Sequence, residues 1–199
     1  MVDMFRALTV ITLLVAPSFT IAQSPDQAKA KEDFKRLMEL AKPGPEHEQL
    51  KTLTGNWNVE MLMRGKDTGF AGTATVATIL EDRFLVIDGT GKTGKRKNAF
   101  RYTVGFDRRN SEYVIILMDT SGTYHVTGRG KPVEGGIRVF GKDNDPHMKS
   151  LGFEKKFGFE LDIRSPDEFS ITTIFVDTRT KEEKPMPTFR HVFRRTETP

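Results

Sequence analysis

A change in hydrophobic period at Gly55 constrains the fold of this chain more than any other feature. From this residue onward, apolar side chains recur at every second position, as at Trp57, Val59 and Met61. Successive side chains of a β-strand point to opposite faces, so this alternation indicates strands with one buried face. Turn-forming residues separate the segments and predict strands at 54–64, 70–80, 83–91, 98–106, 112–119, 122–130, 135–142, 152–164, 168–177 and 187–195.

Short turns between consecutive strands favour an antiparallel meander, and so many strands must close on themselves or split into two packed sheets to hide their edges. We therefore expect an all-β fold, an antiparallel barrel of about ten strands, preceded by an N-terminal amphipathic helix. Ser24 is a suitable N-cap for that helix, and Phe34 and Leu37 lie on one face of it. The segment Lys42 to Pro45 ends it, because proline interrupts a helix.

The first 22 residues have the pattern of a signal peptide. Arg6 precedes an apolar run from Ala7 to Ala16, and small residues at Thr20 and Ala22 suit cleavage after Ala22. A run of ten residues is shorter than the roughly 20 that a membrane span needs. We expect an exported protein, periplasmic or extracellular, without a stable membrane anchor after cleavage. The predicted organisation is a signal peptide at 1–22, a helix with a Pro/Gly linker at 23–45, and the barrel at 46–199.

Composition excludes several classes of function. The chain has 31 Lys and Arg against 27 Asp and Glu, a mixture typical of a solvated surface and not of a nucleic-acid interface, which needs clustered cations interleaved with aromatic residues. Without any cysteine, it forms no disulfides and no thiol-based sites. The glycines and lysines between Val86 and Lys95 imitate a phosphate-binding loop. Neither frame of that motif is complete, and a strand follows instead of a helix, which predicts a lysine-rich hairpin.

The expected barrel has an aromatic and polarisable interior, and barrels of this size can enclose a ligand. We predict that the protein binds or carries a small hydrophobic molecule. A filled barrel that acts as an interaction module of the cell envelope remains an alternative. The candidate ligand-binding residues are Met61, Phe84, Phe100, Tyr102, Phe157, Phe159, Phe175 and His191.

His191 is the candidate with most chemical interest, because it shares a strand face with Phe189 and Phe193. An inward imidazole can hydrogen-bond a ligand, bind a metal-containing cofactor, or be a core residue with an internal partner. Tyr102 is the second polar group expected inside. The four histidines show no metal-ligand spacing, so we assign no metal site and no catalytic residue, and whether the protein is an enzyme stays open. The residues alone predict no cofactor.

Three stretches resemble a bacterial family known as domain of unknown function 1579. They are PGPEHEQLKTLTGNWNVE from Pro43 to Glu60, ILEDRFLVIDGTG, and YTVGFDRRNSEYVIILMDTSGT. The resemblance extends from Pro43 to Arg195. It implies membership of the calycin superfamily, antiparallel barrels that bind small apolar ligands.

In that superfamily, a G-x-W motif on the first strand is covered by an arginine from the last strand. Gly55 and Trp57 match the motif, and Arg194 or Arg195 would supply the guanidinium. The related nitrobindins hold haem through a histidine near the C-terminal strand, where His191 lies. The resemblance therefore implies a second possible function, a haem protein that acts on reactive nitrogen species.

Overall fold

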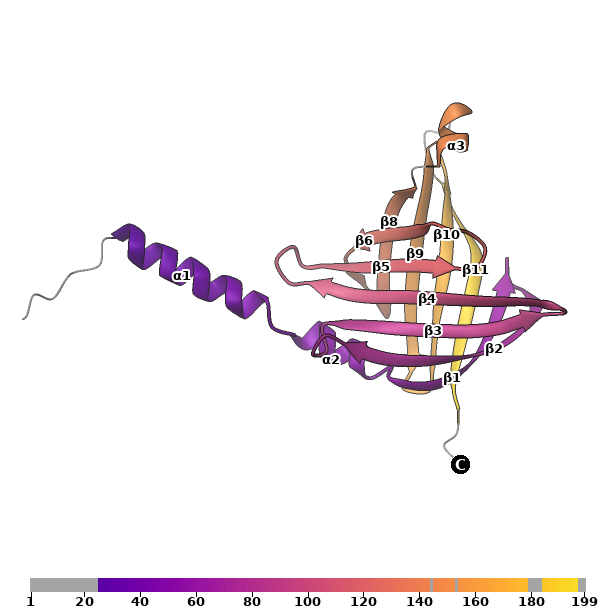
Figure 1. Ribbon diagram of the computed structural model, residues 1–199, viewed down its shortest axis with the longest axis horizontal. Helices are drawn as coiled ribbons and strands as arrows, with labels where there is room; N and C mark the ends of the chain where they lie inside the picture. The colour runs from indigo at the N-terminus through magenta and orange to yellow at the C-terminus, as the bar shows by residue number, and fades with distance from the viewer. Residues whose placement is uncertain (1–24, 144, 153, 179–183, 197–199) are drawn as a thin grey trace, which may run out of the picture. The chain divides into compact units, whose positions relative to one another are not determined.

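A closed antiparallel barrel forms the main body of the protein (Figure 1). The structure, a computed structural model, describes residues 25–143, 145–152, 154–178 and 184–196, so the expected signal peptide lies outside the described residues. The elements are α1 (Pro25–Leu40), α2 (Pro45–Lys51), β1 (Gly55–Met63), β2 (Lys66–Ile79), β3 (Phe84–Thr93), β4 (Arg96–Asp107), β5 (Glu112–Asp119), β6 (His125–Gly130), β7 (Pro132–Val133), β8 (Gly136–Asp143), α3 (Pro146–Ser150), β9 (Lys155–Ser165), β10 (Glu168–Asp177) and β11 (Lys184–Arg195).

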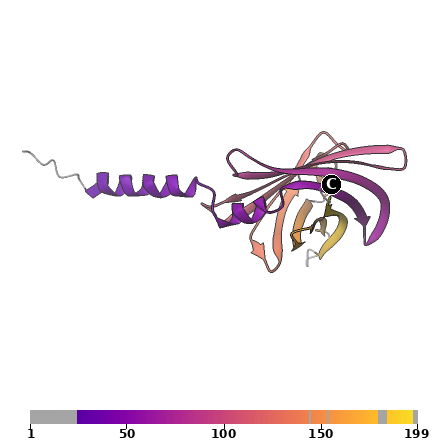
Figure 2. The same ribbon diagram turned by 90° about the horizontal axis from the view of Figure 1, so that it is seen from below.

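Consecutive strands from β1 to β6 and from β7 to β11 pair antiparallel, and β1 also pairs with β11, where Met61 lies opposite His191. A pairing between Arg129 of β6 and Phe140 of β8 closes the ring, and the two-residue β7 adds only to β8. The strands curve into a continuous wall (Figure 2). The predicted ten-stranded meander barrel is thus confirmed, with β7 as a small addition. The short helix α3 lies in the connection between β8 and β9.

Alternation of burial follows the predicted period. On β4, Phe100, Tyr102 and Val104 are buried while Arg101 between them is exposed. The inward positions of neighbouring strands continue this surface into one apolar core. Burial of this core supplies the main driving force for folding. The chain has no cysteine, so no disulfide adds to it.

The barrel end next to α2 is sealed by a compact group around Trp57. Leu50 of α2 and the following Leu53 are buried there, and the Trp57 indole nitrogen donates to the Leu53 carbonyl oxygen at 3.0 Å. The Arg195 guanidinium lies 4.3 Å from the centroid of the Trp57 ring. Gly55 makes this approach possible, since a Cβ at that position would lie 2.6 Å from Nη1 of Arg195. Of the two arginines predicted for this contact, Arg195 makes it.

The turn between β2 and β3 has an unusual backbone. Leu80, Glu81 and Asp82 all have positive φ, at 52°, 56° and 63°. Residues other than glycine disfavour this left-handed conformation, because their Cβ atom comes too close to the following carbonyl oxygen. Asp82 stabilises the turn, because its carboxylate accepts hydrogen bonds from Lys51 of α2 and from Thr78.

The chain divides into two units, with the boundary between Leu37 and Met38. In the first unit, α1 exposes apolar side chains on one face, and Phe34 and Leu37 are 64% and 56% exposed. In the second unit, the Arg108 side chain donates to the carbonyl oxygens of Glu39 and Lys42, which holds the chain segment that enters α2.

Candidate functional site

The inner wall of the barrel changes character between its two ends. We call the end opposite α2 the mouth; it carries the β1–β2 hairpin at 64–65, the β3–β4 hairpin at 94–95 and the loop at 120–124. Near α2, inward side chains such as Trp57 and Phe193 are completely buried. Toward the mouth, the inward residues Met61, His191 and Phe175 are only half-buried. A small molecule could therefore contact the inner wall on the mouth side.

His191 lies on this half-buried part of the wall, in the middle of β11. Its cross-strand neighbours are Met61 on β1 and Ile171 on β10. The Phe100 ring stacks on the imidazole, with 4.4 Å between centroids and 18° between planes. The Tyr102 hydroxyl and His191 Nδ1 are 2.9 Å apart and form a hydrogen bond. Within the described part of the chain, Nε2 of His191 has no hydrogen-bond partner.

Burial controls the protonation of both groups. It lowers the pKa of His191 to about 4, against a weak opposing effect from the Asp119 carboxylate. Burial also raises the pKa of Tyr102, although a hydrogen bond with the Thr173 side chain partly offsets the rise. At neutral pH, the site therefore holds an uncharged imidazole beside an uncharged phenol. Such a pair can donate and accept hydrogen bonds but carries no charge to neutralise an ion.

Two further polar groups line the inner face of the β3–β4 hairpin. Thr93 Oγ1 and Asn98 Oδ1 are buried, and neither has a hydrogen-bond partner among the residues that the structure describes. A buried polar atom without a partner costs about 1–3 kcal/mol, so each is a candidate to bind a polar group of a ligand or a water molecule. These residues and Thr173 were not among the candidates predicted from the sequence. The sequence does contain a sign of such residues, namely a polar residue at an inward position of a strand. Asn98, for example, shares a strand face with Phe100.

The other predicted contact residues fall into two groups. Phe159 is completely buried in the core. Phe157 and Phe175 form a ring pair at 4.7 Å on β9 and β10. The inward orientation expected for Phe84 is wrong, because it lies on the outer face of β3 and is 39% exposed. Pairing of Leu85 with Val104 turns Leu85 inward, and the Phe84 ring then covers Gly105 from outside.

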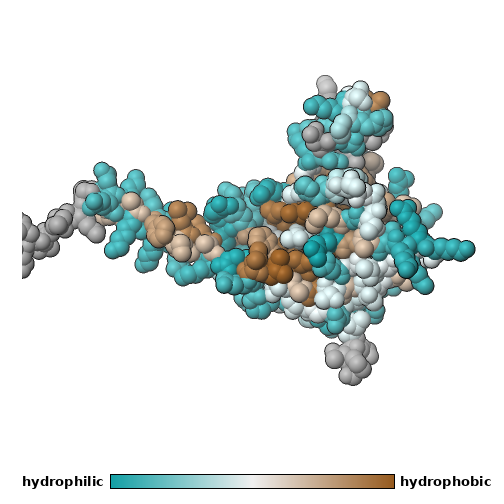
Figure 3. Space-filling model, in the orientation of Figure 1, coloured by the Kyte–Doolittle hydropathy of each residue, from teal (hydrophilic) through white to brown (hydrophobic). Residues whose placement is uncertain are grey.

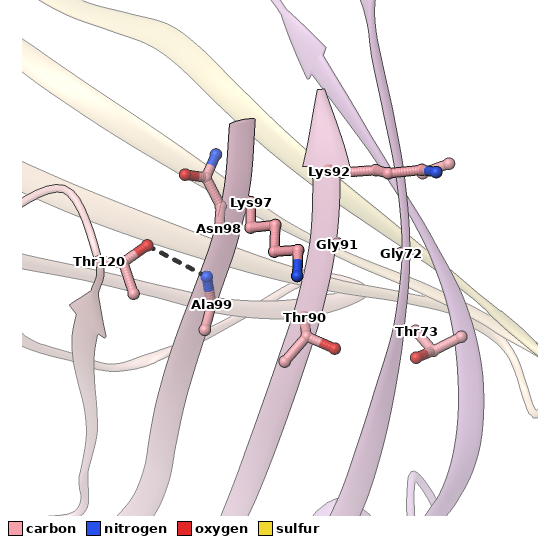
Figure 4. A pocket seen from close by; sticks show the side chains of 10 residues that line it. Gly72, Thr73, Thr90, Gly91, Lys92, Lys97, Asn98, Ala99 and Thr120 are labelled. Carbon is pink, nitrogen blue, oxygen red and sulfur yellow. Dashed lines mark hydrogen bonds between the residues drawn. The ribbon is translucent and has the colours of Figure 1, made fainter. Parts of the chain in front are cut away.

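Apolar side chains therefore appear on the outer face as well (Figure 3). A groove of about 610 Å³ also lies outside, on β2, β3 and β4 (Figure 4). Its surface combines small side chains, such as Thr90 and Ala99, with Lys92 and Lys97. Thr120 accepts a hydrogen bond from the Ala99 amide at 3.1 Å. The groove has no buried polar cluster comparable to His191 and Tyr102, so the inner wall is the stronger candidate site.

In the part of the chain that the structure describes, no group of three His, Cys, Asp or Glu side chains could hold a metal ion. None of the helices described is both long and apolar enough to cross a bilayer.

Comparison with solved structures finds matches of low similarity, among them two redesigned β-barrels. A redesigned β-barrel has 14% identity and a TM-score of 0.40, over 74% of this chain and 95% of its own. EF1p2_mFAP2b bound to DFHBI has 13% identity and a TM-score of 0.40, over 75% and 97% of the two chains. The redesigned barrel mFAP0 bound to DFHBI has 12% identity and a TM-score of 0.38, over 72% and 99%. These TM-scores support no conclusion about the site.

No curated protein matches the sequence. The family described as "Protein of unknown function (DUF1579)" matches residues 42–195, which include the whole barrel and α2. The chain therefore belongs to the DUF1579 family.

Proposed function

We propose that the barrel binds one small, uncharged and mainly apolar molecule against the mouth side of its inner wall, with His191 as the hydrogen-bonding group. The observation that carries the proposal is the state of His191, which is neutral, stacked on Phe100 and bonded to Tyr102 through Nδ1. Its Nε2 is left for a ligand. When Tyr102 donates to Nδ1, Nε2 carries the ring proton and would bind an acceptor such as a carbonyl oxygen.

The surroundings favour an uncharged ligand. Met61, Phe70 and Phe100 supply apolar contact surface around the imidazole. Transfer of apolar area out of water contributes about 25 cal/mol per Å². A charged group would have to lose its hydration next to neutral His191, which is unfavourable unless a counter-charge is close. The role is thus that of a carrier or sensor, without assigned catalytic residues.

Two parts of this proposal concern the protein's wider setting. We infer calycin superfamily membership from the Gly55, Trp57 and Arg195 arrangement, which reproduces the expected closure of the barrel. We also infer export, based on the signal-peptide pattern of residues 1–22. N-terminal sequencing of the protein from its native host tests the second inference, because cleavage after Ala22 predicts Gln23 as the first residue.

Binding can be tested with the neutral fluorescent probe N-phenyl-1-naphthylamine. Wild-type protein should give saturable one-to-one enhancement of probe fluorescence. Met61→Trp should abolish it, since Met61 lies opposite His191 and the larger side chain would cover the imidazole. Met118→Trp is the matched control, because Met118 lies on the outer face and is 39% exposed. Absence of saturable binding, or equal loss in both variants, would support the filled-barrel alternative instead.

Haem binding through His191 ranks second. Iron needs a free imidazole nitrogen, and Nε2 meets that requirement among the described residues. Against this, Phe100 stacks on the ring, and the Phe70 and Phe193 ring centroids lie 6.0 and 6.3 Å from it, so a macrocycle would have to displace aromatic packing. A Soret band on addition of haemin that is lost in His191→Ala would establish haem binding; native mass spectrometry of protein from its own host would identify any other ligand.

A further inference from the structure

The mouth of the barrel carries a concentration of unpaired positive charge. The β1–β2 and β3–β4 hairpins, residues 63–69 and 92–97, contain six cations and a single carboxylate, Asp67. Within the described residues, none of these cations forms an ion pair, whereas exposed arginines elsewhere on the barrel, such as Arg101 and Arg138, do. The six cations are Arg64, Lys66, Lys92, Lys95, Arg96 and Lys97.

β2 connects the two hairpins into one surface. Phe70 near the start of β2 lies opposite Met61 of β1 on one side and opposite Thr93 of β3 on the other. The hydrophilic tip of the β3–β4 hairpin projects from the right-hand side of the molecule in Figure 3. The sequence predicted only a lysine-rich hairpin here, without a neighbouring basic segment. The fold instead places it at the same end as a second basic hairpin.

An apolar depression accompanies these charges. It measures about 980 Å³ and lies between the end of β1 and the start of β11, with Arg64 and Lys66 on its border. Met63 and Met186 line it and are 47% and 42% exposed. Exposed apolar side chains gathered in one depression are unfavourable in water, and such patches are typical of surfaces that bind a partner or a membrane.

We propose that this mouth surface, formed by the two basic hairpins and the methionine-lined depression, docks on an anionic lipid bilayer. Unpaired lysines and arginines are attracted to anionic headgroups, and their long side chains can reach the phosphate level while apolar neighbours enter the interface. Methionine suits this position, because its flexible side chain adapts to irregular apolar surroundings. A single-stranded nucleic acid fits less well, because its bases stack on aromatic side chains among the cations and residues 92–97 contain none.

Docking in this orientation turns the mouth side of the inner wall toward the bilayer. Docking would involve only the outer rim and does not require the proposed ligand site. Failure of membrane docking would therefore leave the proposed ligand binding intact, and the reverse also holds.

Vesicle sedimentation tests the proposal with the mature protein. Wild type should sediment with vesicles of phosphatidylglycerol and phosphatidylcholine but not with phosphatidylcholine alone, and binding should fall as salt rises. Lys95→Glu combined with Arg96→Glu should lower the partition coefficient at least about tenfold. The matched control is Arg129→Glu combined with Lys131→Glu, which makes the same charge change on exposed residues toward the opposite end of the barrel. This control should retain at least half of the binding.

A second variant tests the apolar component. Met63→Ser combined with Met186→Ser leaves every charge in place and should weaken binding about threefold to tenfold, most clearly at high salt. Far-UV circular dichroism confirms that each variant is folded. The proposal is overturned if wild type ignores anionic vesicles, if the control variant loses as much binding as the hairpin variant, or if duplex DNA competes the protein off the vesicles at equal phosphate concentration.

Discussion

Replacement of Arg195 by methionine should destabilise the barrel far more than the same change at Arg194. Arg195 donates to the carbonyl oxygens of Thr54 at 2.8 Å, Thr52 at 3.1 Å and Pro166 at 2.8 Å. Loss of a hydrogen bond costs about 1 kcal/mol for each of these three carbonyl groups. The cation–π contact with Trp57 adds about 0.5–1 kcal/mol. We therefore expect Arg195→Met to lower the free energy of unfolding by about 3–4 kcal/mol.

Arg194 is the control, because it is adjacent in sequence but points outward. Its side chain is 50% exposed and pairs with Glu60 and Glu168, contacts worth less than about 1 kcal/mol at a surface. The assay is urea denaturation at pH 7, followed by far-UV circular dichroism, because Trp57 fluorescence would itself respond to loss of Arg195. If Arg195→Met loses no more stability than Arg194→Met, the closing role of Arg195 is refuted.

Three more predictions follow from particular side chains. Because the folded-state pKa of His191 is lowered from 6.5 to about 4, the unfolded chain binds the proton more readily, so stability should be full above about pH 6.5 and fall toward pH 4 by at most about 3 kcal/mol. In His191→Phe the decline of stability toward pH 4 should be smaller, and the decline that remains reflects other groups such as His47, whose pKa is also lowered. Equal pH curves for wild type and variant would contradict the lowered pKa of His191. Glu81→Gly should raise stability in urea by about 0.5–1 kcal/mol because it relieves a φ of 56°, and a loss would show the turn is not strained. Gly141→Ala should prevent closure between β6 and β8, since its Cβ would collide with the Thr127 carbonyl oxygen; a variant that melts like wild type would exclude that packing.

Much of the fold could be predicted because it depends on a local property. Alternation at period 2 and turn residues between segments predicted the ten strands. The inward position of His191 followed from its neighbours Phe189 and Phe193 in the same way. Each of these predictions needed only the residues of one strand.

Other features depended on pairing between strands and could not be predicted. Leu85 and Val86 are apolar neighbours, so the alternation does not say which face of β3 is inside, and Phe84 was placed on the wrong one. Only pairing with β4 decides this, since a one-residue change of register exchanges the two faces. The partner of Nδ1 of His191, Tyr102, is 89 residues away in sequence.

The sequence by itself determined that this chain forms a barrel with a histidine facing inward, because the hydrophobic period is a property of single segments, whereas an arginine over Trp57 was expected from the family resemblance. Only the tertiary structure decided that Arg195 and not Arg194 covers the indole, that Tyr102 holds His191, and that two basic hairpins meet at one end. Each of these is a contact between segments far apart in the chain. Such contacts depend on closure of the sheet and the register of its strands, which no single segment contains.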